Sequence, residues 1–417
     1  MDLNKREYVT DVLKKKDNSK VTVAGWVERV KLMGNLAFIN LRDMTGVLQI
    51  VAKGFNDLNK ITPESVIAAS GIMKKGQKKS GEKELILENY ELINRAGTPL
   101  PVDLIQNTTQ MEKRIDYRHL DLHNPKIQAI FRIQSEILHA FREYFYKEGF
   151  VEFQTPSIIS SASEGGTDLF EVKYFNEKAY LAQSPQLYKQ MGATSLEKVT
   201  MVVTVWRAEK HDTIRHLNES RQMDIEEAFK DEFGVMKRME ECIPFIIKEI
   251  NKNCSNELRL LNVKIEIPKF KYLSYEETVK LLKIRYGEDL TPENEKELNK
   301  KFPNTVVFVY DWPLEIKPFY IMPKDKKTAM GFDAIYNGME ISSGGQRIHL
   351  PELLIERLKA KGLDPENFKS YIDSFRHGSP IHSGWSIGLE RFTMILLGLS
   401  NIREAVLFPR DRYRLTP

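Results

Sequence analysis

Five short segments of this chain concentrate charged and polar residues of the kinds that bind nucleotides and small acids. They are SASEGGTDLF (161–170), QSPQLYKQ (183–190), WRAEKHDTIRHLNESRQMDIEEAF (206–229), FDAIYNGMEISSGGQR (332–347) and GWSIGLER (384–391). In the third, Arg207 and Arg215 lie on an apparent hairpin, and paired guanidinium groups suit a polyphosphate because arginine makes planar, bidentate contacts. A ladder of surface ion pairs is the alternative, but such pairs contribute only about 0–1 kcal/mol each. We therefore expect a polyphosphate near this hairpin.

The fourth segment supplies oxygen ligands and a further cation. Asp333, Glu340 and Ser343 offer the hard oxygen atoms that Mg²⁺ prefers when it bridges phosphates. Arg347 follows them and is suited to pair with an anionic group of a substrate. In the fifth segment, Gly384 and Gly388 would let the backbone approach a flat ligand, and Arg391, at the start of a helix, can stack on a purine ring.

The first two segments carry weaker signals. The Gly165–Gly166 pair permits a loop that closes over a substrate. Gln186 and Lys189 are three residues apart, so they would share one face of a helix, where the ammonium could meet a carboxylate. On its own, this second pattern is explained better by a solvated helix surface.

The composition bounds the class of protein. The chain has 417 residues, of which 41% are hydrophobic and 29% charged, and its formal charge is +4. These values exclude a wholly disordered chain and permit, without demanding, a nucleic-acid partner. No apolar stretch reaches the roughly 20 residues of a membrane span, and the N-terminus has no apolar core of a signal peptide. With only Cys242 and Cys254, at no zinc spacing, we expect a cytoplasmic protein that does not bind a membrane.

The first hundred residues read as a small barrel. Five short strands between residues 20 and 94, separated by turns, suit an OB-fold. Strand alternation places Phe38 and Arg42 on the face opposite Ala37 and Ile39, and places Gln49 outward on the next strand. A ring beside an amide can stack on a single-stranded base and read its edge, whereas a half-buried barrel aromatic is the alternative. Residues 101–122 read as a hinge or linker.

Residues 123–417 read as an α+β domain. Ile130, Ile133, Ile137 and Phe141 recur at helical spacing. After them, strand-like runs alternate with a few helical stripes. Strands clustered with helices at one side indicate an antiparallel sheet flanked by helices.

In this order, the five segments resemble the signatures of class II aminoacyl-tRNA synthetases, and within them the archaeal-type aspartyl-tRNA synthetases. EGFVEFQTP resembles the first family motif, with Pro156 at its proline; WRAE…RHLNE…DIEEAF resembles the second and GWSIGLERF the third. EGGTDLF, QSPQLYKQ and EISSGGQR resemble the signatures of the subgroup. The likeness covers nearly the whole chain. It implies an OB-fold that binds the anticodon, followed by a six-stranded antiparallel catalytic sheet.

The resemblance also implies an activity. ATP and L-aspartate give aspartyl-adenylate and pyrophosphate, and the aspartyl group then moves to the 3′ end of tRNA(Asp), with tRNA(Asn) left open as a second substrate. The implied cofactor is Mg²⁺, and the implied assembly is a homodimer with Pro156 in its interface.

Site residues carry over only at positions that match the motifs. Those implied to bind aspartate are Ser163, Glu164, Gln186, Lys189, Asp224 and Arg347. Those implied to bind ATP are Arg207, Glu209, Arg215, His216, Glu340 and Arg391, with Arg207 and Arg391 as the catalytic cations. The implied magnesium ligands are Glu340 and Ser343, with Asp333 adjacent, and the implied anticodon-binding residues are Phe38, Arg42 and Gln49.

Some positions depart from the family pattern, and rival activities stay open. Ser220 and Arg221 stand where an aromatic residue often stacks on adenine, Ser386 replaces a glycine, and Trp206 replaces a phenylalanine. An asparaginyl-tRNA synthetase shares the scaffold but should not need two cations aimed at an amide. An asparagine-synthetase-like paralogue would lack the first domain. A silent OB-fold RNA-binding protein would not need the full set of charged residues.

Overall fold

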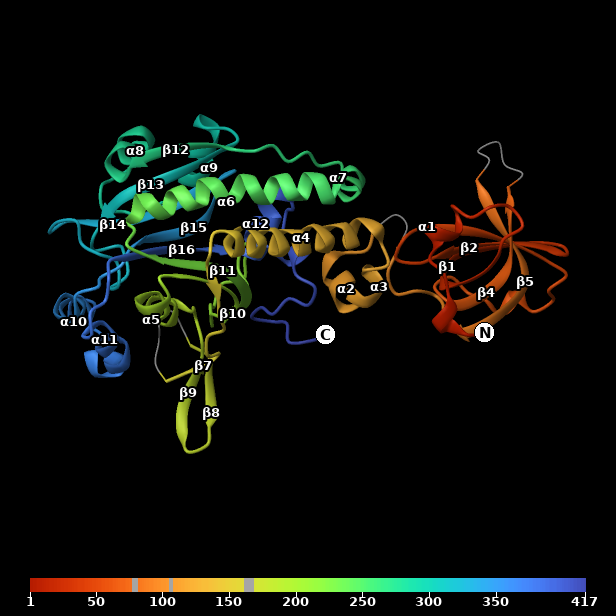
Figure 1. Cartoon of the computed structure of the whole chain (residues 1–417), viewed down its shortest axis with the longest axis horizontal. Helices are drawn as coiled ribbons and strands as arrows, with labels where there is room; N and C mark the ends of the chain where they lie inside the picture. The colour runs from red at the N-terminus through yellow and green to blue at the C-terminus, as the bar shows by residue number, and fades with distance from the viewer. Residues whose placement is uncertain (77–81, 105–107, 161–168) are drawn as a thin grey trace. The chain divides into compact units, whose positions relative to one another are not determined.

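The computed structural model describes residues 1–76, 82–104, 108–160 and 169–417. The chain divides into two compact units, Met1–Asp103 and Leu104–Pro417. Figure 1 draws the first in red to orange and the second in yellow to blue. In the part of the chain that is described, no helix has the length and apolar character needed to cross a membrane.

The first unit is a closed five-stranded barrel with strand order β1-β2-β3-β5-β4. Its strands are β1 (Lys20–Met33), β2 (Leu36–Arg42), β3 (Val47–Lys53), β4 (Val66–Lys75) and β5 (Lys83–Asn94). Apolar residues alternate into the barrel, as Ala37, Ile39 and Leu41 do on β2, where each is at least 98% buried. Short helices α1 (Val9–Val12), η1 (Leu3–Lys5) and η2 (Leu58–Lys60) complete the unit.

The second unit is built on a sheet of eight strands within the described residues, in the order β12-β13-β14-β15-β16-β11-β10-β6. Their bounds are β6 (Val151–Glu152), β10 (Lys198–Trp206), β11 (Glu219–Ala228), β12 (Lys269–Ser274), β13 (Thr305–Pro313), β14 (Thr328–Tyr336), β15 (Met339–Gln346) and β16 (His382–Gly388). The six from β13 to β10 are antiparallel, as predicted. The sequence did not signal the edge strand β12, whereas the other edge strand, β6, lies in the segment 150–156, which reads as extended. Both edge strands join in parallel.

Three helices pack with this sheet to form the main core. They are α4 (Pro125–Lys147), α6 (Glu232–Asn253) and α12 (Leu389–Leu397). Helix α4 begins where Asn124 caps the amide of Lys126 and Pro125 occupies the first turn, an arrangement that suits a helix start. Its stripe of Ile133, Ile137 and Phe141 is fully buried and packs in one cluster with Trp385 of β16.

The remaining elements surround the sheet (Figure 1). A separate three-stranded sheet contains β7 (Ile158–Ile159), β9 (Glu177–Leu181) and β8 (Glu171–Tyr174). The other helices are α5 (Gln186–Leu196), α7 (Ser255–Leu261), α8 (Tyr275–Leu282), α9 (Pro292–Lys301), α10 (Pro351–Ala360), η3 (Pro365–Phe368), α11 (Lys369–Phe375) and η4 (Ile402–Ala405).

The segment predicted as a linker, 101–122, contains two short helices. These are α2 (Met111–Asp116) and α3 (Arg118–Asp121), and both lie in the second unit. Arg114 and Arg118 are buried and both pair with Asp121, at 2.9 and 2.6 Å. These ion pairs order the segment internally, and Arg118 also donates to the carbonyls of Arg403, Val406 and Leu407, which attaches the segment to its unit.

Candidate active site

One cavity of about 310 Å³ in the second unit brings together residues from four of the five polar segments. The predicted site residues that line it are Gln186, Lys189, Arg207, Glu209, Arg215, His216, Asp224, Glu340, Ser343, Arg347 and Arg391. Ser163 and Glu164, in the remaining segment, lie outside the described residues. Pro156 lines a separate pocket of about 200 Å³.

At one end of the cavity lie Lys189, Asp224 and Arg347, which line it, and Glu226, which pairs with two of them from outside the lining. We call these four residues the buried end, and each is at most 2% exposed. Nζ of Lys189 donates to Oδ1 of Asp224 at 2.8 Å and lies 3.6 Å from Oε2 of Glu226. Arg347 donates from Nε and Nη2 to the two oxygens of Glu226, at 2.9 and 3.3 Å. Both cations therefore contact Glu226, and Oε2 is common to them.

The two carboxyl groups respond differently to this environment. Burial raises the pKa of Asp224, and the contact with Lys189 offsets only part of that rise. Burial alone would raise the pKa of Glu226 too, but the Arg347 guanidinium and the Lys189 ammonium together hold that pKa below its ordinary value. Glu226 is thus kept ionised by two cations, which it in turn keeps in place.

The local structure explains how the sequence brings these groups together. Asp224 and Glu226 are two residues apart on β11, so both side chains leave the same face of the sheet. Gln186 and Lys189 lie in the first turns of α5, and both are buried. The solvated helix surface that the sequence left open for Lys189 is therefore wrong.

Three residues at or near the buried end, Glu226, Gln190 and His382, were not predicted as site residues. Gln190 accepts a hydrogen bond from Nε2 of Gln186 at 2.8 Å, and its amide contacts the His382 ring at 3.0 Å. Burial lowers the pKa of His382, opposed by the Glu226 carboxylate. Gln190 follows Gln186 by four residues on one helix face, which is the sequence signal that could have identified it.

At the other end of the cavity, which we call the loop end, lie residues of the loop 207–218 between β10 and β11. Glu209 lies 3.5 Å from Nε2 of His216, and Arg215 pairs with Glu295 of α9 at 3.0 Å. Arg391, in the first turn of α12, donates to the backbone oxygen of Glu340 at 3.0 Å. Burial lowers the pKa of His216, against the opposing effect of Glu209.

Beside the loop end, Glu340 and Ser343 lie on β15. Burial raises the pKa of Glu340 to about 7, and the neighbouring carboxylate of Asp333 adds to the rise. Asp333 faces Ser343 across the β14–β15 ladder, but its Oδ2 accepts from Lys317 at 2.6 Å. Within the described residues no group of three acidic, histidine or cysteine side chains is placed to hold a metal ion. Glu340 and Ser343 carry oxygen atoms of the kind that suits Mg²⁺, which commonly binds one or two carboxylates together with substrate phosphates.

The barrel presents a polar face outside its core. Phe38 and Gln49 are half-buried and lie on neighbouring strands, in the pairs Phe38↔Val51 and Asn40↔Gln49. Arg42 differs from the expectation that it points outward. It is 8% exposed and donates to Glu64 at 2.9 Å, because an acidic residue 22 positions later draws its guanidinium inward. Of the lysines in the β4–β5 turn, Lys74 and Lys75 are exposed, and Lys78 and Lys79 lie outside the described residues.

Comparison with known proteins identifies this arrangement. The profile of the class II tRNA synthetases (D, K and N) matches residues 110–412, and that of the OB-fold nucleic acid binding domain matches residues 21–93. The chain belongs to the class II tRNA synthetases. The predicted fold, an OB-fold barrel followed by a class II catalytic sheet flanked by helices, is confirmed.

Relatives of this class II synthetase match along almost their whole length. An aspartate–tRNA(Asp/Asn) ligase of Methanothermobacter thermautotrophicus is 41% identical, covering 100% of this chain and 99% of the relative. An aspartate–tRNA(Asp) ligase of Pyrococcus furiosus is 42% identical, covering 98% and 99%.

Solved structures of both aspartyl and asparaginyl enzymes resemble the chain. Asparaginyl-tRNA synthetase of Pyrococcus horikoshii, complexed with asparaginyl-adenylate, has a TM-score of 0.93 at 33% identity and covers 99% of both chains. Aspartyl tRNA synthetase of Entamoeba histolytica has a TM-score of 0.86 at 33% identity and covers 99% of this chain and 93% of its own. Likeness of the fold therefore does not separate the two amino acids.

The departures from the family motifs have structural counterparts in this synthetase. Ser220 lines the cavity, whereas Arg221 donates to Glu219 at 3.0 Å and lies 3.5 Å from Glu390. Nε1 of Trp206 also donates to Glu219, at 3.2 Å. Ser386, in place of glycine, donates to Asp224 at 3.0 Å and so adds a contact at the buried end.

The sequence suggested that Gly384, in the third motif of this synthetase, lets the backbone approach a flat ligand. In the structure, the close neighbour of Gly384 is instead part of the protein. A Cβ atom at this position would overlap Oε2 of Glu226 and the backbone oxygen of Ile225. The absence of a side chain at Gly384 is therefore what allows the Glu226 carboxylate to lie against β16.

Proposed function

We propose that this chain is an aspartate–tRNA ligase, which forms aspartyl-adenylate from L-aspartate and ATP and then transfers aspartate to the 3′ end of tRNA(Asp). The observation that carries the proposal is the buried end of the cavity, where Lys189 and Arg347 are held by one carboxylate. Full-length relatives at 41–43% identity that carry this name support it.

In the proposed amino-acid site, aspartate binds the part of the Arg347 guanidinium that does not pair with Glu226. Glu226 takes Nε and Nη2, so Nη1 is the nitrogen that this ion pair does not use. The side-chain carboxylate of aspartate would accept from Nη1 and from Lys189. Gln186 and Asp224, which line the same cavity, would receive the α-amino group. Ser163 and Glu164 are proposed to contribute from outside the described residues.

The proposed first step is an in-line displacement at phosphorus. The α-carboxylate oxygen of aspartate forms a bond to the α-phosphorus of ATP, and the bond from phosphorus to the bridging oxygen breaks to release pyrophosphate. Of the two cations that the family resemblance implies, Arg207 would neutralise charge on the α-phosphate, and Arg391 would neutralise charge at the far end of the triphosphate. The residues beside them are Glu209, Arg215 and His216. Catalysis is then positioning and charge stabilisation, and no side-chain nucleophile is required.

Mg²⁺ is the proposed cofactor, held by Glu340 and Ser343 with Asp333 next to them. When bound, it neutralises phosphate charge and orients the triphosphate. In the second step, the terminal ribose hydroxyl of the tRNA attacks the aspartyl carbonyl, and AMP leaves with the electrons of the broken anhydride bond.

Asparagine is the competing substrate, because asparaginyl enzymes have the same fold. An asparagine side chain would bring an NH₂ group toward the donors of Lys189 and Arg347, neither of which can accept a hydrogen bond. A site built from hydrogen-bonding charges rejects a ligand that leaves them unpaired. The buried end therefore favours aspartate.

The experiment is ATP–pyrophosphate exchange with each amino acid. We expect exchange that depends on aspartate and magnesium, with asparagine at least a hundredfold less efficient in kcat/KM, as expected for unpaired buried charges. Equal exchange with both amino acids would contradict the specificity, and no exchange with either would contradict the activity. Binding of a non-hydrolysable aspartyl-adenylate analogue by calorimetry would separate a silent binding protein from an inactive preparation.

The remaining partners are proposals of the same kind. Charging assays with purified tRNA(Asp) and tRNA(Asn) decide between the two specificities that occur among the relatives. Phe38 and Gln49 are proposed to contact the anticodon, and Arg42 to support that face from its pair with Glu64. A homodimer is supported by the exposed edge strand β6 and by the exposed Pro156 beyond it. A cytoplasmic setting is supported by Cys242 and Cys254, which are both free and buried.

A further inference from the structure

The loop that carries the nucleotide-facing residues lacks regular structure of its own. Between β10 and β11, the described residues 207–218 form neither a helix nor a strand. Arg207, Glu209, Arg215 and His216 all line the cavity from this loop. Its conformation is set by contacts within the loop, such as those of Asn218 with the carbonyls of Arg207 and Glu209, and by contacts with other parts of the unit.

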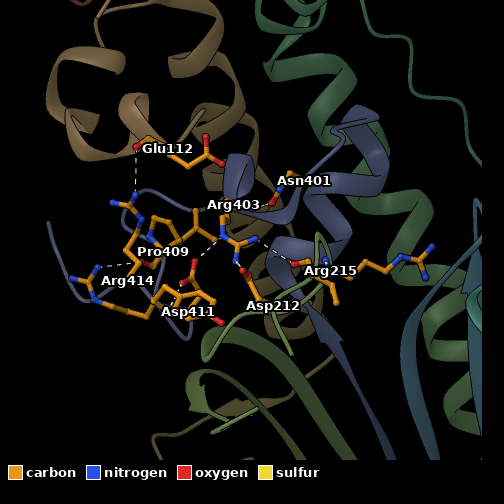
Figure 2. Close-up of polar contacts among 12 residues, drawn as sticks. Glu112, Asp212, Arg215, Asn401, Arg403, Pro409, Asp411 and Arg414 are labelled. Carbon is orange, nitrogen blue, oxygen red and sulfur yellow. Dashed lines mark hydrogen bonds and ion pairs between the residues drawn. The ribbon is translucent and has the colours of Figure 1, made fainter. Parts of the chain in front are cut away.

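Arg403, in η4 near the C-terminus, makes the central contacts (Figure 2). Its Nη1 donates to the backbone oxygen of Thr213 at 3.2 Å, and its Nη2 pairs with the carboxylate of Asp212. Its Nε donates to Asp411 at 2.7 Å. All three guanidinium nitrogens are thus used, two toward the loop and one toward the C-terminal segment.

The backbone of Arg403 is itself fixed. Its amide donates to Oδ1 of Asn401 at 3.0 Å, and its carbonyl oxygen accepts from Nη2 of Arg118 at 3.1 Å. Arg118 is 1% exposed and holds two further carbonyls of the same segment, those of Val406 and Leu407. The amide of Ile402 adds a hydrogen bond to the carbonyl of Ile214 at 2.9 Å. Arg403 therefore projects from a rigid base onto the loop.

Thr213 connects this contact to the nucleotide-facing side chains. Its hydroxyl lies 2.6 Å from Nδ1 of His216 and accepts from the amide of Arg215 at 3.2 Å. Thr213, whose carbonyl oxygen accepts from Arg403, is thus also the residue that orients His216 and begins the turn to Arg215.

We propose that Arg403 is a positioning residue for ATP, which acts through Thr213 to hold Arg215 and His216 toward the triphosphate. This inference rests on the proposed function, because it assigns a role in the binding of that enzyme's nucleotide. Arginine suits the role because its planar fork reaches Asp212, Asp411 and a carbonyl at once, which the single ammonium group of lysine cannot do.

The experiment measures KM for ATP and KM for aspartate separately in pyrophosphate exchange. We expect Arg403→Gln to raise KM for ATP about tenfold or more, as small misplacements of binding groups do, while KM for aspartate stays within twofold. Arg403→Lys should recover part of the loss. Asp212→Asn, which removes the charge from one of the two loop contacts and leaves the hydrogen bond to the Thr213 carbonyl in place, should shift KM for ATP in the same direction by a smaller factor. In the double variant, the two effects should be less than additive.

A matched control is Arg376→Gln, which removes another ion pair of the same unit, the exposed one with Glu352. It should leave both KM values within twofold. Calorimetric titration with ATP alone gives a second readout that needs no amino-acid activation. An unchanged affinity for ATP in Arg403→Gln and Asp212→Asn would overturn the inference, as would equal rises in both KM values. If Arg403→Gln does not fold, Asp212→Asn decides. Failure of the unchanged protein to exchange would instead contradict the proposed function.

Discussion

The two ends of the cavity meet their ligands in different ways. At the buried end, four charged groups are fixed by one another and are at most 2% exposed. At the loop end, the side chains of Arg215, Glu209 and His216 are 18%, 21% and 35% exposed, and the loop that carries them is held from the C-terminal segment. A small diacid can be selected by charged groups whose positions are fixed before it binds. A flexible triphosphate would instead meet a loop whose side chains are more exposed than those of the buried end.

The largest expected effect is at the buried end. Arg347→Ala should lower kcat/KM for aspartate by about 10²–10³-fold, because truncating one partner of a buried charge pair in a binding site costs about 2–5 kcal/mol of binding. It also leaves Glu226 without that partner, which should lower thermal stability. ATP binding, measured by calorimetry, should change little. The double variant Arg347→Gln/Glu226→Gln controls for the stranded charge: it should restore thermal stability without restoring aspartate use. An unchanged KM for aspartate in Arg347→Ala would remove Arg347 from the aspartate site.

The next effect concerns magnesium and pH at the loop end. The pKa of Glu340, about 7, lies above the ordinary value of 4.5, so the carboxyl keeps its proton up to about pH 7 and ionises above it. Because Mg²⁺ binds the ionised form, its apparent affinity should rise from pH 6 to pH 8. Glu340→Gln should weaken magnesium-dependent exchange, as the loss of one electrostatic partner does, by about 10²–10³-fold in kcat.

The pH dependence supplies the control. In Glu340→Gln, the change of magnesium affinity between pH 6 and pH 8 should disappear, because the titrating group is gone. Ser343→Ala should weaken magnesium binding but keep the pH dependence. A persistent slope in Glu340→Gln would assign the titration to another group.

The smallest expected effect lies outside both ends, on the barrel. Gln49→Ala should weaken tRNA charging about three- to tenfold, the cost of one lost hydrogen bond, and leave aspartyl-adenylate formation unchanged. Charging with tRNA(Asp) and with tRNA(Asn) measures the first quantity, and pyrophosphate exchange the second. The half-buried neighbour Val51→Ala, which has no hydrogen-bonding group, is the matched control. A loss of both activities in Gln49→Ala would mean that the residue acts on the fold of the barrel.

The sequence could predict the features whose signal lies within one short stretch of the chain. Strand alternation correctly buried Ala37, Ile39 and Leu41, because a strand has a period of two. The motif segments correctly identified most of the groups that line one cavity, because each segment is continuous. By contrast, Arg42 was expected on the outer face of the barrel, but its side chain points inward and donates to Glu64. No local sequence pattern links these two residues.

Other features depend on pairs far apart in the chain. Lys317 contacts Asp333, and Glu295 contacts Arg215 from 80 positions away. The two helices within 101–122 likewise depend on Arg118, which bonds to carbonyls 285–289 positions later. Periodicity within a window of residues carries no information on such partners.

Because Gly384 has no side chain, the addition of a single methyl group at this position should affect the choice of amino acid. Alanine there would push Glu226 aside, and with it the one anchor that Lys189 and Arg347 share. The proposed selection of aspartate therefore depends in part on the missing side chain at position 384, a residue outside the cavity lining.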